Sequence, residues 1–193
     1  EAMLAAKVEP DTISWTILIS IWARSSLPNH ELEAQAIFDR MLRYGSVPNA
    51  VTYTALLTMW SNSGAKDATK KVVSIFRHMT MTGQKLDTVG YSSLLSALSR
   101  TSDPEAALRA NEVFEQMLEA NVEPDTMSWT ILISIWASSP LPNHELEAQA
   151  IFDRMLQYGT VPNAVTYTTM LKMWMYSKRF KIAQSNVLKI YDR

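Results

Sequence analysis

The sequence predicts an all-α fold, an α-solenoid of stacked antiparallel helix-turn-helix units. The first observation is a helix-start segment that recurs at a constant spacing, and its marker position falls at Pro10, Pro48, Leu86, Pro124 and Pro162, 38 residues apart at every step. The second observation is that each 38-residue unit divides into two helical segments separated by a turn. A single hairpin of this size cannot bury its own apolar faces, so neighbouring hairpins must stack, giving a concave and a convex side.

The repeat spacing also sets the predicted boundaries. Residues 1–11 resemble residues 115–125 and are read as the end of a preceding repeat. The predicted repeats are residues 12–49, 50–87, 88–125, 126–163 and an incomplete or degenerate unit at 164–193, all in one solenoid domain. The segment 8–60 differs from the segment 122–174 at only eight of 53 positions, which indicates a duplication of three repeats. We expect this sequence to be part of a longer array, with any targeting segment outside it.

The first helix of the unit 12–49 should begin after Asp11, which serves as its N-cap, and end near Arg24. Its apolar residues fall on one helical face, at Ile17, Leu18, Ile21 and Trp22. A turn at 25–29 follows, because serine, proline and asparagine interrupt the pattern. The tryptophans at Trp22, Trp60, Trp136 and Trp174 recur at one phase of the repeat, and we expect them to fill the core between repeats.

The second helix of this unit should begin near His30. Its apolar side is made of Leu32, Ala34, Ile37, Phe38, Met41 and Leu42. Gly45 occupies the position of a left-handed C-cap, as do Gly83 and Asn121 in the next two repeats. In the third unit the second helix should open at Asp103, with Pro104 in its first turn. The last unit should have a second helix near residues 178–192, whose register the sequence does not fix.

The composition excludes several classes of function. The chain has no cysteine, a net charge of −1 and no apolar run near the ~18 residues that a membrane span needs, so we expect no thiolate metal site and no membrane insertion. No zinc-protease, phosphate-loop or nucleophile-elbow motif is present, and no carboxylate pair is spaced for catalysis. His30 and His144 are interpreted as exposed first-turn residues. We therefore expect no enzyme activity, cofactor, metal or small-molecule substrate.

The repeat resembles the pentatricopeptide repeat. The resemblance lies in Pro-Asp or Pro-Asn followed by an apolar residue, a polar residue, Tyr or Trp, Thr or Ser and a Leu/Ile pair. It continues in the second helix, where Ala34, Phe38 and Met41 recur as Ala110, Phe114 and Met117. Units of that family usually have ~35 residues. We place the three additional residues in the turn around 25–29, remote from the start of the first helix.

The resemblance implies binding of single-stranded RNA, roughly one base per repeat. It implies that the second residue of each repeat packs on base faces, at Ile13, Val51, Val89, Met127 and Val165. It implies that the fifth and last residues contact the base edge, in the pairs Thr16 with Asn49, Thr54 with Asp87, Ser92 with Asp125 and Thr130 with Asn163, while Thr168 has no visible partner. By the family's pairing rules these four pairs favour the purine-rich run A-G-G-A.

The same residues have an ordinary structural interpretation. Asp or Asn before a helix and Ser or Thr in its first turn are common capping residues, and capping and base contact can coexist. A polar stripe follows one turn beyond the fifth residues, at Ser20, Thr58, Ser96, Ser134 and Lys172. The candidates for phosphate contact are few, namely Arg24, Arg100 and Lys172. So sparse a basic charge predicts modest affinity and a weak salt dependence.

Two functions remain open at this point. The first is an RNA-binding protein of the chloroplast or mitochondrion that acts in transcript processing, stability or translation. The second is a scaffold or assembly subunit of an organellar protein complex, such as a ribosome, respiratory complex or photosystem. The first is the leading hypothesis, and the second is motivated by the near-zero charge, the scarcity of lysines on the expected ligand face, and the six tryptophans and eleven methionines.

Overall fold

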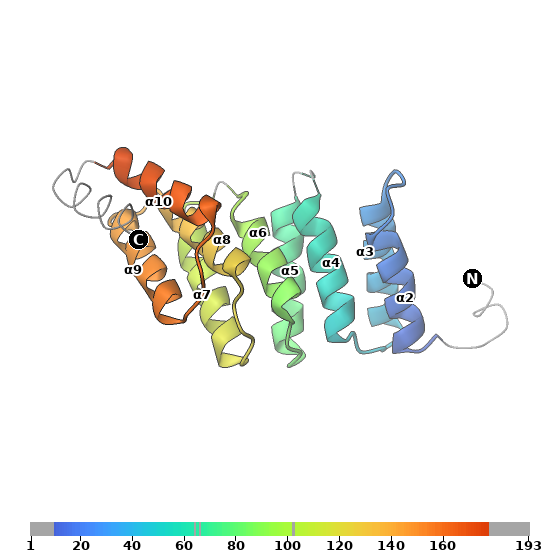
Figure 1. Ribbon diagram of the computed structural model, residues 1–193. Helices are drawn as coiled ribbons and strands as arrows, with labels where there is room; N and C mark the ends of the chain where they lie inside the picture. Colours follow the sequence, from blue (N-terminus) through green and yellow to red (C-terminus); the bar gives the residue numbers. More distant parts are fainter. Residues whose placement is uncertain (1–9, 64, 66, 102, 178–193) are drawn as a thin grey trace. The chain divides into compact units, whose positions relative to one another are not determined.

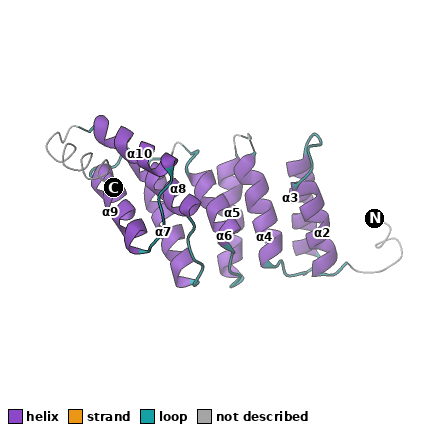
Figure 2. Cartoon of the chain, viewed as in Figure 1, coloured by secondary structure: helices purple, strands orange, loops and turns teal. Residues whose placement is uncertain are grey.

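The computed structural model describes residues 10–63, 65, 67–101 and 103–177, so the helix expected near 178–192 lies outside the described part. Every regular element within these ranges is a helix (Figure 2). The helices are α2 (Thr12–Ala23), α3 (His30–Arg43), α4 (Ala50–Asn62), α5 (Ala68–Met81), α6 (Thr88–Leu98), α7 (Ala106–Glu119), α8 (Thr126–Ala137), α9 (His144–Gln157) and α10 (Ala164–Met175) (Figure 1). None of them is long and apolar enough to cross a bilayer.

The helices form hairpins at the spacing of the sequence repeat. The first helices begin at residues 12, 50, 88, 126 and 164, which are 38 residues apart. In the first hairpin α2 packs along α3, and α4 then packs on α2. The same arrangement recurs when α8 packs along α9 and α10 packs on α8. The predicted fold class, an all-α solenoid of stacked antiparallel hairpins, is confirmed.

Local capping explains where the first helices start. Asp11, Asn49, Asp87, Asp125 and Asn163 each precede a first helix, and each accepts a hydrogen bond from the backbone N–H three residues later, at 2.8–3.0 Å. These bonds satisfy a donor that the helix itself leaves unpaired. The start predicted at Asp103 is less accurate. Asp103 accepts from the N–H of Glu105 within a turn, and α7 begins at Ala106.

The second helices end where the sequence predicts left-handed residues. Gly45 and Gly83 have φ of +70° and +67°, and Gly159 has +77°. Asn121 takes the same conformation at the end of α7, with φ +57°. Asparagine tolerates this region better than other residues with a β-carbon, so its replacement of glycine keeps the chain direction.

The core between hairpins contains the repeated tryptophans. Trp60, Trp136 and Trp174 are buried, as predicted, whereas Trp22 is half-buried. Their ring N–H groups donate across to the preceding second helix, from Trp60 to Gln35 at 3.2 Å and from Trp174 to Gln149 at 3.0 Å. All six tryptophans are buried or half-buried. The tryptophan content therefore gives no exposed aromatic surface for protein contacts.

The chain divides into two compact units, with the boundary between Ala97 and Leu98. The duplicated helices α2 and α8, one in each unit, differ at a single residue, yet their burial differs. The prediction that Ile17, Leu18 and Ile21 pack in the core is wrong, because all three are exposed, and Leu32 on α3 is exposed as well. In α8 the counterparts Leu132 and Ile135 are buried, because α7 packs against α8. Among the described residues α2 has no such neighbour.

Candidate nucleic-acid interface

An exposed apolar side chain recurs near the start of every first helix. An N-cap residue precedes each first helix, and the second residue of that helix is large and apolar in every repeat. The exposed fraction of these second residues lies between 56% and 65%, at Ile13, Val51, Val89, Met127 and Val165. Isolated apolar residues on a surface are unremarkable, but five at equal spacing are a repeated feature of this fold. Apolar side chains spaced one repeat apart are suited to contact the faces of successive bases.

The first unit has a cavity of about 590 Å³ beside two of these residues. Val51 and Val89 contribute its apolar lining, and Thr54 and Asp87 contribute polar atoms. Helix α4 supplies Val51 and Thr54, while Asp87 and Val89 belong to the N-terminal end of α6. The cavity therefore combines two apolar side chains with one predicted recognition pair.

Within this cavity the predicted pair is in direct contact. Thr54 donates its hydroxyl hydrogen to Oδ1 of Asp87 at 3.1 Å, and the N–H of Gly90 donates to the same oxygen at 2.8 Å. No hydrogen bond from the described residues reaches Oδ2 of Asp87, which is exposed. The carboxylate can therefore accept hydrogen bonds from a ligand in the cavity.

The two threonine–asparagine pairs have a different geometry, because a third side chain lies between their members. Thr16 Oγ1 lies 2.7 Å from Thr52 Oγ1, and Thr52 Oγ1 lies 3.0 Å from Asn49 Oδ1. In the second unit Thr130 Oγ1 lies 2.6 Å from Thr166 Oγ1, which lies 3.0 Å from Asn163 Oδ1. Thr16 and Thr130 are buried, whereas Asn163 is exposed and Asn49 is half-buried.

Three further residues were predicted to contact bases, namely Ser92, Asp125 and Thr168. Ser92 is buried on α6 in the first unit, and Asp125 is the exposed N-cap of α8 in the second unit. Asp125 accepts from the hydroxyl of Ser128 at 2.7 Å. Thr168 is exposed on α10. The capping interpretation of the last residues is confirmed for all four, and their contact with bases stays a prediction.

The caps also set the electrostatics of the helix starts. Two hydrogen bonds from Ser14, from its hydroxyl and its N–H, lower the pKa of Asp11, so this carboxylate stays ionised at neutral pH. Burial raises the pKa of a second group, the Tyr53 hydroxyl on α4, which lies 2.8 Å from Nδ1 of His78.

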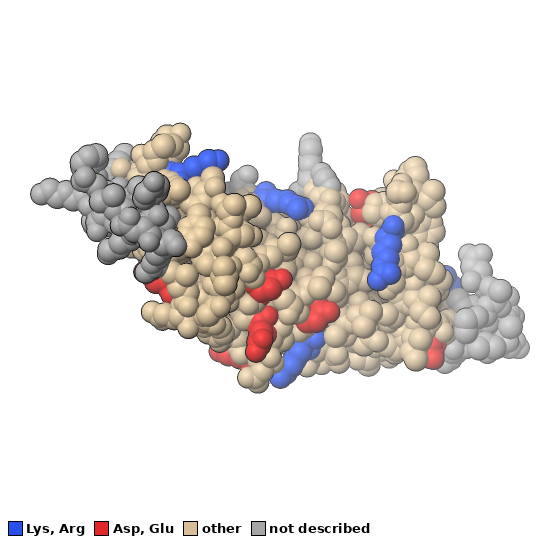
Figure 3. Space-filling view, viewed as in Figure 1, with Lys and Arg blue, Asp and Glu red and all other residues tan. Residues whose placement is uncertain are grey.

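Basic side chains near the cavities are few. Arg24 is exposed, lines the cavity of the first unit and makes no ion pair with the described residues. The second unit has a cavity of about 660 Å³ at the equivalent place, and Lys172 lines it. In the duplication Arg24 corresponds to Ser138 and Lys172 to Thr58, so each cavity has one cation from a different helix. Arg100 is also exposed. On the face drawn in Figure 3, lysine and arginine side chains form small separate patches of blue.

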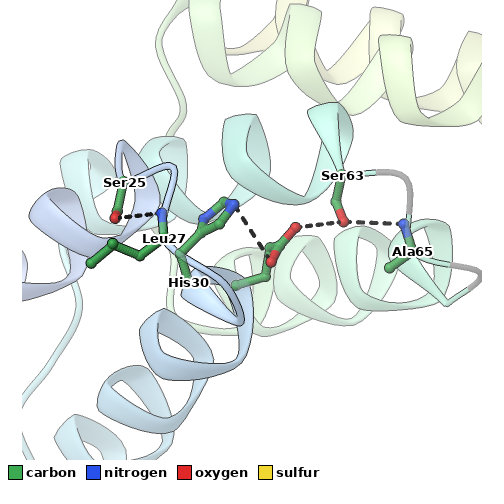
Figure 4. Close-up of polar contacts among 6 residues, drawn as sticks. Ser25, Leu27, His30, Ser63 and Ala65 are labelled. Carbon is green, nitrogen blue, oxygen red and sulfur yellow. Dashed lines mark hydrogen bonds and ion pairs between the residues drawn. The ribbon is translucent and has the colours of Figure 1, made fainter.

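A polar cluster at the rim of the first cavity was not predicted from the sequence. Glu31 accepts from the hydroxyl of Ser63 at 3.1 Å, and Nε2 of His30 lies 3.5 Å from the same carboxylate (Figure 4). His144, Glu145 and Ser177 repeat this arrangement in the second unit. The expectation that His30 and His144 are exposed is wrong, since both are half-buried and their Nδ1 atoms are inaccessible. The duplicated Asn-His-Glu-Leu-Glu segment was the available signal.

This cluster does not have the geometry of a catalytic site. The serine hydroxyl donates to the glutamate and not to the histidine, so the cluster lacks the order of serine, histidine and carboxylate found in a nucleophilic triad. The contacts instead connect the start of α3 to the C-cap of α4. Among the described residues no group of histidine, cysteine, aspartate and glutamate is arranged to hold a metal ion.

Comparison with known proteins gives one family and several similar structures. The sequence model of a family described as the pentacotripeptide-repeat region of PRORP matches residues 1–139. No curated protein matches the chain. The structure is similar to the PPR domain of Arabidopsis thaliana protein-only RNase P 1 (PRORP1) in complex with tRNA, with a TM-score of 0.72 and 18% identity over 100% of this chain and 89% of that chain.

Two structures of a second protein are also similar. PPR10 from maize has a TM-score of 0.69 and 21% identity, and PPR10 in complex with an 18-nt psaJ RNA element has 0.62 and 20%. Both comparisons cover 98% of this chain, but only 26% and 28% of PPR10. This chain thus spans about a quarter of the length of PPR10. At these identities the similarity shows the fold.

Proposed function

Because the chain belongs to the pentatricopeptide-repeat family, whose sequence model matches residues 1–139, we propose that it binds single-stranded RNA with one base per repeat. The observation that carries the proposal is the exposed apolar residue that recurs in every repeat, two copies of which line one cavity with the pair Thr54 and Asp87. In the first cavity Val51 and Val89 would contact the faces of a base, and Asp87 with Thr54 would contact its edge. The similar structures of PRORP1 with tRNA and of PPR10 with psaJ RNA support the proposal that this chain binds RNA.

The preferred sequence follows from the chemistry of the last residues. Asp87 and Asp125 have only acceptor atoms at neutral pH and suit guanine, whose Watson–Crick edge has N–H donors. Asn49 and Asn163 have amide N–H donors, which suit the ring-nitrogen acceptors of adenine. With the family's pairing rules, the proposed run is A-G-G-A.

We propose that the repeats act by binding and not by catalysis. Occlusion of a transcript or recruitment of other factors would then affect its processing, stability or translation. The proposed location is the chloroplast or the mitochondrion. A scaffold role in an organellar protein complex is the competing proposal, and binding of folded tRNA is a further one, because the matching family model and one similar structure come from PRORP proteins.

The first test measures the RNA preference directly. Fluorescence anisotropy should show tighter binding to an unstructured RNA that contains A-G-G-A than to a pyrimidine-rich RNA of the same length. In the variant Asp87→Asn, the second preferred base should change from guanine towards adenine, by about tenfold in relative affinity, because the carboxylate acceptor becomes an amide with donors. Asp39→Asn is the matched control, since Asp39 lies on α3 and bonds Gln35.

The outcomes separate the proposals. Equal binding of both RNAs at low salt, or binding of neither, would contradict base recognition. Tighter binding to a tRNA transcript than to the linear RNA would favour the folded-RNA proposal. Co-purification of protein partners that survives nuclease treatment, together with absent RNA binding, would favour the scaffold.

A further inference from the structure

We propose that the third residue of the following repeat is a specificity-determining residue, because it decides whether the fifth residue of a pair bonds the last residue directly or is held inside the protein. This inference rests on the proposed RNA binding. The position is occupied by Thr52, Gly90, Ser128 and Thr166 for the four successive pairs. It has no direct access to a ligand, because Thr52, Ser128 and Thr166 are fully buried and Gly90 is buried too.

Threonine at this position occupies the fifth-residue hydroxyl. Thr16 Oγ1 contacts both Thr52 Oγ1 and the carbonyl oxygen of Thr12, each at 2.7 Å. Thr52 Oγ1 also contacts Asn49 Oδ1 at 3.0 Å. The hydroxyl groups of Thr16 and Thr52 have two hydrogens between them for these three contacts. The hydrogen of Thr16 is therefore used within the protein, and Thr16 has none left to donate to a base. Thr130 and Thr166 repeat the arrangement in the second unit.

The amide of the asparagine is then the group of the pair that remains available to a base. Oδ1 of Asn49 accepts from the N–H of Thr52 at 3.0 Å, and this bond fixes the amide with its nitrogen on the other side. Both N–H donors of the Asn49 side chain are free among the described residues. When threonine occupies the third position of the following repeat, the last residue of the pair therefore presents an oriented amide. The fifth residue of that pair stays inside the protein.

Glycine at this position lets the two members of the pair contact each other directly. Without a side chain at Gly90, Thr54 reaches Asp87 directly and donates to Oδ1. A Cβ on Gly90 would lie 3.0 Å from Thr54 Oγ1 and 2.8 Å from Cδ2 of Leu86, so a side chain there requires Leu86 to move. Both donors to Asp87 converge on Oδ1, which leaves Oδ2 as an outward acceptor.

Helix capping alone does not account for these contacts. Thr52 completes a capping box, in which its hydroxyl accepts from the N–H of Asn49 at 3.4 Å. The N–H of Gly90 bonds Asp87 at 2.8 Å without any hydroxyl at that position, so the bond to the last residue does not depend on the capping box. The contact between Thr16 and Thr52 instead joins two repeats, 36 residues apart. A residue that only capped α4 would have no reason to bond the fifth residue of the preceding repeat.

The experiment uses variants that leave every pair unchanged. Thr52→Val keeps the side-chain shape and removes the hydroxyl, so Thr16 keeps only its contact with Thr12 and Asn49 keeps only its bond from the N–H of residue 52. Binding to four RNA sets, each varied at one base of A-G-G-A, should show that adenine preference at the first base falls about tenfold. Preferences at the other three bases should not change. Thr166→Val should have the same effect at the fourth base only, and Thr52→Ser should retain the wild-type preference.

A second variant converts the glycine arrangement into the threonine arrangement. Leu86→Pro combined with Gly90→Thr restores the proline found at the marker position of the other repeats and removes Cδ2 of Leu86, the atom that a Cβ at position 90 would meet at 2.8 Å. Guanine preference at the second base should fall about tenfold although Asp87 and Thr54 are intact. Circular dichroism and thermal unfolding establish that each variant is folded.

The outcomes distinguish this inference from the proposed function. If folded Thr52→Val and Thr166→Val bind with wild-type preference at every base, the third residue only caps its helix and the inference is overturned. If all four preferences weaken together, the effect is general destabilisation and the inference is overturned as well. A wild-type chain that binds RNA without base preference overturns the proposed function itself, before any variant is compared.

Discussion

The residues that end the second helices combine a left-handed backbone conformation with open surroundings. Gly159 has φ +77°, and a Cβ at this position would meet no atom within 4 Å. Asn121 shows that a residue with a side chain is accepted at the same point of another repeat. The requirement at these positions is therefore one of backbone conformation and not of space.

This requirement gives a stability prediction. Gly159→Ala should lower the free energy of unfolding by about 1 kcal/mol, because alanine pays the cost of the left-handed region without a steric clash. Gly159→Asn should cost clearly less. Urea unfolding of both variants beside the wild type measures the difference, and equal losses for alanine and asparagine would show that φ is not the cause.

Some contacts between single residues can be predicted from the sequence, and others cannot. The caps at Asp11 and Asn49 were predictable because each involves residues three positions apart on one helix. The hydroxyl contact between Thr16 and Thr52 was not, because it depends on how closely two hairpins pack. The same holds for the direct bond between Thr54 and Asp87, which needs the absence of a side chain at Gly90.

At the scale of elements, α2 and α8 show what an apolar pattern does and does not predict. Their sequences place the same apolar residues on the same faces. Helical periodicity identified these faces correctly as apolar, but burial depends on a partner helix, and only α8 has α7 against it among the described residues. The duplication therefore provides two copies of one helix in two environments.

These two copies allow a matched comparison of one substitution. The side chain of Leu132 is 2% exposed, whereas its counterpart Leu18 is 43% exposed. Leu132→Ala should destabilise the protein by about 2–5 kcal/mol, because it leaves a cavity in a packed core. Leu18→Ala should cost less than about 1 kcal/mol. Native-state hydrogen exchange resolves the effect on each helix, and equal effects would mean that the α2 face is covered in solution.

At the scale of the whole molecule, the repeat period was sufficient to predict the fold class, because a 38-residue hairpin that recurs has to stack on its neighbours. The division near Ala97 was not visible in the sequence, which continues through it at the same period. Charge is also a property of this scale. With a net charge of −1, attraction to phosphate depends on a few local cations and not on the molecule as a whole.

The proposed RNA binding should therefore depend only weakly on salt. Three phosphate contacts, at Arg24, Arg100 and Lys172, predict a slope of log K against log salt of about −2 for a single strand. Arg24→Ser should reduce this slope by about 0.7. Arg43→Gln is the matched control, because it removes an equal charge from a residue that does not line the cavity.

Both substitutions introduce the residue that the duplicated segment already has, Ser138 for Arg24 and Gln157 for Arg43, so each is compatible with the fold. Affinity for the A-G-G-A RNA measured from 50 to 200 mM salt gives the slopes. Because the cations contact phosphates and not base edges, the preference for A-G-G-A over pyrimidines should persist in Arg24→Ser. If Arg43→Gln reduces the slope as much as Arg24→Ser does, RNA affinity follows net charge, and Arg24 has no specific place on the bound strand.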